Sequence, residues 1–227
     1  VNEVANGLAG SDCALALLPA GTGNVLAAQL GLLAVPTSLH VPDPVGAARR
    51  LAAGRIRSVD LGHARARGKG GRHFVLWAGV GLDAEIVRRV EGESRSWKRS
   101  MGPVAYAAIG VRSLLEITGT PVTLRHDAER ARMSLLMAVV ANVPLYGGAV
   151  QLAPAARIDD ERLDLVLFPG KGPPDTLRHL AGLASPRPMA TGSAASVQAR
   201  TVSVVSEAPL PVHLDAETFG QPRFFAS

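Results

Sequence analysis

The stretch "RMSLLMAVVANV" at residues 132–143 decides the fold of most of this chain. It is a run of apolar and β-branched residues, which is typical of a β-strand. Runs of the same kind lie on both sides of it. They are "PVTLRHD" (121–127), "RLDLVLFPG" (162–170), "ASVQARTVSVVS" (195–206) and "LPVHLDAE" (210–217). The second half of the chain is therefore predicted to be rich in strands.

Two further strand-like runs lie upstream, "RSVDLGHARA" (57–66) and "RHFVLWAGVGLD" (72–83), and "GKGG" (68–71) fits a hairpin turn between them. A helical region is expected from about residue 84 to 117, broken by the polar stretch "EGESRSWKRSMGP". A short helix is predicted at 173–184 and a surface loop at 185–196.

The first 55 residues have a different pattern of apolar residues, which predicts helices together with a strand. Apolar positions at Val1, Val4, Ala5 and Leu8 have helical spacing, and the uninterrupted apolar run 14–18 fits a strand buried on both faces. Helices are predicted at 24–30 and at 43–54, the second with Asp43 as its cap. Because the chain begins inside an element, without methionine, we expect a truncated α/β nucleotide domain at 1–55 and a strand-rich domain at 56–227.

The composition narrows the class of protein. The chain has 227 residues, 47% of them apolar, and a net charge of +5 that comes mostly from arginine. Such a surplus attracts the phosphates of nucleotides, nucleic acids or lipid headgroups, but the charge is scattered along the sequence, which disfavours nucleic acid. No apolar run approaches the roughly 18 residues of a membrane span. The single Cys13, predicted to be buried, and the lack of a leader favour a reducing, cytoplasmic compartment.

The loop "PAGTGN" (19–24) has two interpretations. Its glycines let backbone N–H groups approach an anion at the start of a helix, and Thr22 adds a hydroxyl. It matches neither of the common phosphate-binding fingerprints, so a plain glycine turn is the alternative.

Acidic residues gather at three places. Asp83 follows a strand where a helix should begin, and we interpret it as an N-cap. A turn at 159–164 carries Asp159, Asp160, Glu161 and Asp164, which could hold a hard cation or could simply be solvated. Asp215 and Glu217 stand two apart on the same side of a strand end, as a general base and its partner or as a strand terminus. The six histidines show no metal-ligand spacing and are assigned no site.

In their order along the chain, these stretches resemble the diacylglycerol kinase catalytic-domain family, which includes bacterial lipid kinases and sphingosine and ceramide kinases. The matching stretches are "VNEVANGL", "LPAGTGNVLAAQLGL", "GVGLDAEIV", "NVPLYGGAVQLAPAARIDDERLDLVLF" and "VHLDAE". The resemblance covers nearly the whole chain. It implies an NAD-kinase-like fold, in which a three-layer α/β nucleotide domain precedes a β-sandwich domain and the active cleft lies between them.

The resemblance also implies site residues and ligands. ATP would contact Val1 and Asn2, which follow the family's Gly-Gly-Asp-Gly-Thr segment, and the loop residues Gly21, Thr22, Gly23 and Asn24. A structural Mg²⁺ would be bound by the side chain of Asp160 and by backbone carbonyls near Arg157 and Arg162. Asp215 and Glu217 match the acids implicated as the base that deprotonates the lipid hydroxyl, while a second Mg²⁺ would arrive with ATP.

The lipid would be met at a membrane surface. The basic and aromatic stretch that carries Arg88, Arg89, Arg95, Trp97, Lys98 and Arg99 fits an anionic bilayer, with a solvated polar face as the alternative. We therefore expect a cytoplasmic protein that is peripheral at the inner membrane surface, possesses no nucleic-acid partner and forms a homodimer.

Three residues depart from the family pattern. Ala216 replaces the glycine between the two acids, Val25 replaces an aspartate, and Glu161 replaces a glycine of the acidic turn. Two alternatives to a lipid kinase stay open. One is a noncatalytic remnant that binds a lipid or a partner, and the other is a kinase of a soluble acceptor such as NAD.

Overall fold

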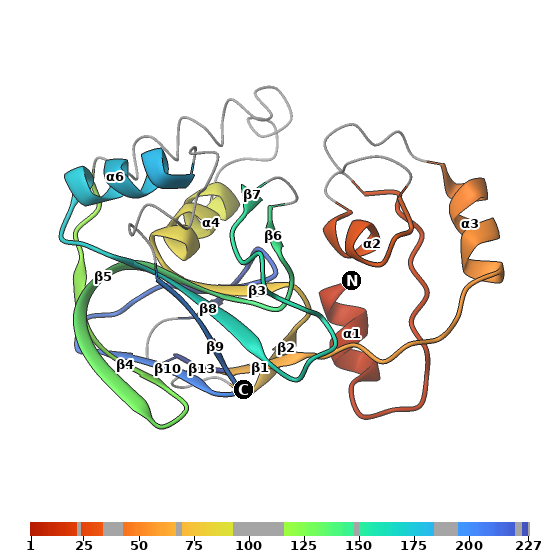
Figure 1. Ribbon diagram of the computed structural model, residues 1–227, viewed down its shortest axis with the longest axis horizontal. Helices are drawn as coiled ribbons and strands as arrows, with labels where there is room; N and C mark the ends of the chain where they lie inside the picture. The colour runs from red at the N-terminus through yellow and green to blue at the C-terminus, as the bar shows by residue number, and fades with distance from the viewer. Residues whose placement is uncertain are drawn as a thin grey trace.

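The computed structural model describes residues 1–21, 24–33, 43–66, 70–92, 116–147, 150–183, 195–220 and 224–226. Figure 1 shows a small helical N-terminal part beside a large curved sheet, with further helices above the sheet. Of the loop predicted at 185–196, residues 185–194 lie outside the described residues, and residues 195–196 belong to a strand instead. The basic residues Arg95, Lys98 and Arg99 and the aromatic Trp97 also lie outside the described residues.

The N-terminal part contains helices α1 (Asn2–Leu8), α2 (Val25–Gln29) and α3 (Pro44–Ala52). Asn24, in the left-handed conformation, precedes α2, and Gly31 with φ of 71° follows it. The carboxylate of Asp43 accepts a hydrogen bond from the Gly46 backbone N–H at 2.8 Å, which confirms the predicted cap of α3. The buried residues of α1 are Asn2 and Ala5. Of the apolar positions that the sequence suggested, Ala5 is buried, whereas Val1 and Val4 are exposed and Leu8 is half-buried.

The prediction of a strand at residues 14–18 is wrong. The segment forms no strand, Leu15 and Leu18 are exposed, and Cys13 is exposed as well. An all-apolar strand is buried only when strands pair with it on both edges and layers cover both faces. Within the described part of the chain, no strand pairs with this segment. The expectation of a buried Cys13 is wrong for the same reason.

The strand-rich region is confirmed, and all its pairings are antiparallel. The main path of the large sheet runs β12-β11-β3-β5-β4-β10-β13-β1-β2, and β8 pairs with β5 and β9. Two short strands, β6 and β7, form a separate hairpin. The bounds are β1 (Gly62–Arg65), β2 (Arg72–Phe74), β3 (Trp77–Gly81), β4 (Thr120–His126), β5 (Glu129–Ala141), β6 (Leu145–Tyr146), β7 (Val150–Gln151), β8 (Leu163–Pro169), β9 (Ala195–Ala199), β10 (Val202–Ser206), β11 (Val212–Leu214), β12 (Glu217–Gly220) and β13 (Phe224–Ala226).

The sheet has an apolar core on each side. The inner core is built from alternate residues of most strands, among them Phe74, Leu124 and Leu165. The outer core joins the sheet to the N-terminal part, because Ala5 of α1 and Leu26 of α2 pack with Trp77 and its neighbours. This second core places α1 beside β2 and β3, where the candidate site lies.

Helices α4 (Leu82–Gly92) and α6 (Pro173–Leu183) lie above the sheet in Figure 1. Helix α4 contacts β3, β5, β11 and β12, and α6 contacts β8. Among the described residues, none of the helices is both long and apolar enough to cross a bilayer.

Candidate functional site

The two acids predicted to share one strand end are separated by a tight turn. Strand β11 ends at Leu214, Asp215 and Ala216 form the turn, and Glu217 begins β12. Both turn residues have positive φ, 48° and 66°. A two-residue hairpin loop with φ above zero at both positions is a type I′ turn, which favours Asp-Gly or Asn-Gly. Ala216, which replaces the family's glycine, thus has a backbone conformation that favours glycine, and the placement of the two acids on one strand is corrected.

The Asp215 carboxylate accepts hydrogen bonds at both of its oxygens. Three donors are consecutive backbone N–H groups at the junction of β2 and β3, namely Val75 at 2.9 Å, Leu76 at 2.9 Å and Trp77 at 3.1 Å. The fourth is the side-chain amide of Asn2 at 2.6 Å. A carboxylate offers about four acceptor positions, and these contacts fill them. Asp215 thus ties together α1, the β2–β3 junction and the turn.

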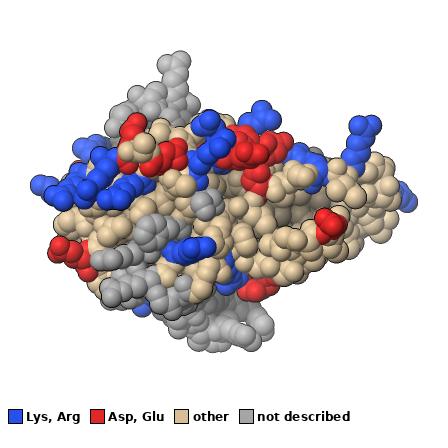
Figure 2. Space-filling view, turned by 90° about the horizontal axis from the view of Figure 1, so that it is seen from below, with Lys and Arg blue, Asp and Glu red and all other residues tan. Residues whose placement is uncertain are grey.

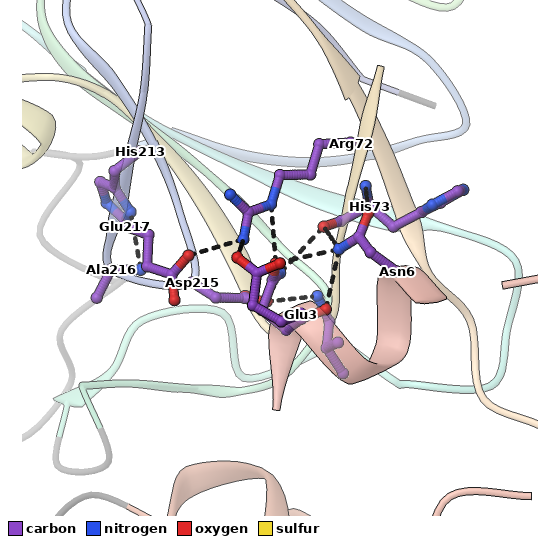
Figure 3. Close-up of polar contacts among 10 residues, drawn as sticks. Glu3, Asn6, Arg72, His73, His213, Asp215, Ala216 and Glu217 are labelled. Atoms are coloured by element: carbon purple, nitrogen blue, oxygen red, sulfur yellow. Dashed lines mark hydrogen bonds and ion pairs between the residues drawn. The ribbon is translucent and has the colours of Figure 1, made fainter. Parts of the chain in front are cut away.

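Arg72 of β2 lies between acids from distant parts of the chain (Figure 3). Its guanidinium contacts Glu217 at 2.7 Å and Glu3 at 2.5 Å, and its Nε donates to the Asn2 side chain at 3.0 Å. The side chain of Glu217 is 49% exposed, and only its Oε2 is engaged by Arg72. Glu217 is therefore the acid of the turn that is half-exposed and has an oxygen that Arg72 does not engage.

Asn2 is 6% exposed, and its side chain forms hydrogen bonds with other groups of the protein. Besides Asp215, its amide donates to the backbone carbonyl of His73, and its carbonyl accepts from Arg72 and from Asn6. Asn6 in turn accepts a hydrogen bond from the His73 N–H at 2.7 Å. The side chain of Val1 is 63% exposed. The nucleotide contacts of Val1 and Asn2 stay predictions, and in this arrangement the amide of Asn2 positions Asp215.

The glycine loop is closed by its own asparagine. The Gly21 N–H donates to the side-chain oxygen of Asn24 at 3.0 Å, and the Asn24 amide returns a bond to the Gly21 carbonyl at 2.5 Å. The side chain of Asn24 thus stabilises the conformation of the loop, a role that the sequence did not indicate. Thr22 and Gly23, also predicted to bind nucleotide, lie outside the described residues.

A buried polar group that the sequence did not indicate lies behind the turn. His213 is fully buried, and its Nε2 is 2.5 Å from Asp83, which also accepts a hydrogen bond from the hydroxyl of Tyr146. The Nδ1 of His213 accepts the Ala216 N–H at 3.2 Å, so the neutral ring carries its proton on Nε2 and donates to Asp83. The pKa of Tyr146 is raised well above 10, first by burial and then by the charge of Asp83.

This group corrects the interpretation of Asp83 as an N-cap, because α4 begins at Leu82 and the Asp83 carboxylate points to His213 and Tyr146. Gly79 makes room for it, since a Cβ there would lie 2.0 Å from Asp83 and 2.2 Å from His213. A histidine inside a buried strand, two residues before an acid, is the one signal in the sequence that could have indicated the contact.

The acidic turn has oxygen ligands of the kind that Mg²⁺ prefers, but few of them. The Asp160 carboxylate accepts the Arg162 N–H through Oδ1 at 3.1 Å, which leaves its second oxygen for a cation. Glu161 has a φ of 56°, as expected where the family carries glycine. No group of three or more His, Cys, Asp or Glu side chains gathers within the described residues. The Mg²⁺ at Asp160 and the carbonyls near Arg157 and Arg162 therefore stays a prediction, and an ion bound there would keep several waters.

The basic stretch predicted for the membrane is only partly described. Arg88 and Arg89 of α4 both form ion pairs with Glu85 at 2.7 Å, and Arg89 also pairs with Glu116 at 2.8 Å. The hydrogen bond from Arg88 is the main cause of the lowered pKa of Glu85. These two arginines therefore carry less free positive charge than the sequence suggested.

The structure combines a curved antiparallel sheet with an N-terminal helical part, and Asn2 of that part contacts Asp215 in the turn between β11 and β12. This combination is that of the NAD-kinase-like fold class. Residues 77–225 match the family described as "YegS C-terminal NAD kinase beta sandwich-like domain", and residues 1–64 match the "Diacylglycerol kinase catalytic domain". The first of these models covers more than half of the chain, so the chain belongs to the YegS-like family with this β-sandwich domain, and its first 64 residues are similar to the diacylglycerol kinase catalytic domain. The predicted family and fold class are confirmed.

Named relatives agree with this assignment. The chain is 28% identical over 220 residues to a "Probable lipid kinase YegS-like" of Pseudomonas putida, covering 94% of this chain and 64% of the relative. It is 25% identical to a "Diacylglycerol kinase" of Staphylococcus carnosus, covering 97% and 68%. A crystal structure of a diacylglycerol kinase from Bacillus anthracis superposes with a TM-score of 0.67 at 17% identity, covering 99% of this chain and 68% of that one. The chain thus spans about two thirds of these relatives.

Proposed function

We propose that the protein containing this chain is an ATP-dependent lipid kinase that phosphorylates a hydroxyl of diacylglycerol or of a related lipid. The observation that carries the proposal is the acid turn at 215–217, held by Asn2 and Arg72 beside the part of the chain that matches the diacylglycerol kinase catalytic domain. Names of relatives support the lipid as acceptor.

Within this proposal the two acids have different tasks. Asp215 has its acceptor positions filled by three backbone N–H groups and Asn2, so it positions the turn. Glu217 is half-exposed and has a free oxygen, so it is the better candidate for the base. In the transfer, the lipid hydroxyl oxygen would form a bond to the γ-phosphorus, the bond to the bridging oxygen would break, and ADP would leave. Glu217 would accept the hydroxyl proton.

Cations would neutralise the charge of the phosphates. Mg²⁺ supplies electrostatic stabilisation when it is bound with ATP. A structural Mg²⁺ would be held by Asp160 and the carbonyls of Arg157 and Arg162. The positive charge of Arg72 offsets the negative charges of Glu3 and Glu217. Arg72 thereby reduces the repulsion between these two acids and stabilises the turn. Action at a cytoplasmic membrane surface and a homodimeric state belong to the proposal as well.

The test measures transfer of labelled γ-phosphate to diacylglycerol in mixed micelles by the complete gene product that contains this chain. Glu217→Gln should lower kcat by about 10²- to 10⁴-fold, the usual contribution of a general base. Glu207→Gln is the matched control, because Glu207 is exposed on the loop before β11 and should leave kcat within about twofold. NAD serves as a soluble acceptor in a parallel reaction.

One outcome would contradict the lipid acceptor, and another would contradict the role of Glu217. Transfer to NAD without transfer to any lipid hydroxyl would assign the protein to soluble acceptors. Undiminished lipid phosphorylation by the Glu217→Gln variant would remove Glu217 from the role of base and leave the kinase function standing.

A further inference from the structure

One face of the sheet is lined with arginine. The pairings Arg125 with Arg130, Thr123 with Arg132 and Ser203 with Arg125 place these side chains on the same outer side of β4, β5 and β10, since directly paired residues share a face. The inner side of the same strands is buried, as Val122, Leu124 and Val204 show. We call the outer set the arginine face. It consists of Thr123, Arg125, Arg130, Arg132, Ser203 and Val205.

The arginines of this face have no acidic side chain as a partner among the described residues. Within the described part of the chain, no ion pair or side-chain hydrogen bond engages Arg125, Arg130 or Arg132. The nearest acids along these strands are in the β4–β5 hairpin. Asp127 accepts hydrogen bonds from Thr201 and from the Arg200 N–H, and Glu129 pairs with His126 at 3.6 Å. Figure 2, which looks at the molecule from below, shows Lys and Arg gathered toward its left-hand end.

The arrangement of the arginines is unfavourable unless an anion is bound. Arg125 and Arg130 are directly opposite each other on adjacent strands, where like charges destabilise a sheet. Side chains at directly opposite positions have Cβ atoms about 5 Å apart, so both guanidinium groups can reach the same small anion. The three arginines lie close together in the sequence, and the register of the β4–β5 hairpin places Arg125 directly opposite Arg130.

The arginine face also contains a hollow with hydroxyl groups. Thr123, Arg125, Arg130, Ser203 and Val205 line a space of about 300 Å³. The Ser203 hydroxyl is buried and has no hydrogen-bond partner within the described structure. A buried hydroxyl without a partner is costly, and one in a hollow that two arginines also line is suited to an oxyanion.

We propose that this hollow binds a phosphate group, with Arg125 and Arg130 as the charged ligands and Ser203 as a hydroxyl ligand. Two guanidinium forks and a hydroxyl provide more donors than the two oxygens of a carboxylate use, whereas a phosphate has three or four oxygens to receive them. The phosphate belongs either to a soluble ion or to the headgroup of an anionic phospholipid. This site lies on strands that contribute nothing to the acid turn, so it is independent of the proposed kinase reaction.

The first arm of the test uses inorganic phosphate on the complete protein. Calorimetric titration and thermal unfolding, both in a buffer free of phosphate, measure binding. The wild type should bind and show a rise in Tm with phosphate concentration. Arg130→Gln should weaken binding by about tenfold, the usual loss of one charged hydrogen-bond donor, and Ser203→Ala should weaken it less. Arg178→Gln is the matched control, because Arg178 is 62% exposed on α6 and pairs with Asp175.

The second arm uses sedimentation with vesicles of phosphatidylcholine alone or mixed with phosphatidylglycerol. Loss of sedimentation with the phosphatidylglycerol vesicles in Arg130→Gln, but not in Arg178→Gln, would assign the site to a lipid headgroup. Binding of inorganic phosphate alone would assign it to a soluble ion. Equal effects of Arg130→Gln and Arg178→Gln, or no binding in either arm, would overturn the proposal. Neither readout depends on phosphoryl transfer, so failure of the kinase proposal would not alter it.

Discussion

At the scale of single residues, the turn between β11 and β12 contains a mismatch between residue type and backbone. Ala216 has a φ of 66°, a region in which its Cβ is crowded and glycine is not. We expect Ala216→Gly to raise the free energy of unfolding by about 0.5–1 kcal/mol, because relief of the strain exceeds the added entropy of the unfolded chain. Urea denaturation measures this.

Ala128→Gly in the β4–β5 turn is the matched control. Ala128 is not among the residues with positive φ, so the same change should lower stability there. If both variants lost stability equally, the left-handed conformation of Ala216 would be contradicted.

Tyr146 gives a prediction for alkaline pH. Its pKa in the folded state is raised well above 10, chiefly by burial, whereas the unfolded chain has the ordinary value. Above about pH 10 the unfolded state therefore loses a proton that the folded state keeps, so the folded state loses stability as the pH rises. Tyr146→Phe should lack this contribution, although near pH 7 it should cost about 1–2 kcal/mol because Asp83 loses a donor.

Denaturation of the wild type and of Tyr146→Phe at pH 7 and at pH above 10 measures both effects. The difference between the two proteins should shrink as the pH rises. A constant difference would mean that the phenol is not held protonated by its surroundings.

At the scale of elements, regular strands and capped helices could be predicted because their signals are local. The run of β-branched residues at 132–143 became part of β5, and Asp43 capped α3 as its sequence position indicated. The prediction of a strand at 14–18 was wrong because the burial of an apolar strand depends on neighbouring strands, and the sequence of the segment itself gives no information about them. The same limit applies to α1, whose buried face is set by the contacts of Asn2 with β2 and the turn.

The candidate site was predictable in part for a similar reason. Asp215 and Glu217 were found as a pair, but their division of tasks depends on hydrogen bonds from residues about 140 and 213 positions away. The contact of His213 with Asp83 spans 130 positions, and the arginine face depends on the register of three strands. Long-range polar contacts leave no periodicity in the sequence, so these features required the fold.

At the scale of the whole molecule, the described residues of the N-terminal part are joined to the sheet by an apolar core and a polar junction. The polar junction has Asn2 at its centre, since its side chain contacts Asp215, Arg72 and the His73 carbonyl. A junction built mainly on one buried amide should be sensitive to the loss of that amide.

We therefore expect Asn2→Ala to weaken the attachment of α1 by about 2–3 kcal/mol, because Asp215 loses a donor and Arg72 an acceptor in a part-buried site. Hydrogen exchange measures it: amides of α1 should lose roughly 30-fold or more of their protection, while those of β5 keep theirs, since β5 is a central strand of the large sheet and pairs with β3, β4 and β8. Val4→Ala is the control, because Val4 lies on the same helix and is 50% exposed. Equal loss of protection in α1 and β5 would mean that the two parts unfold as a single unit and that the junction does not act locally.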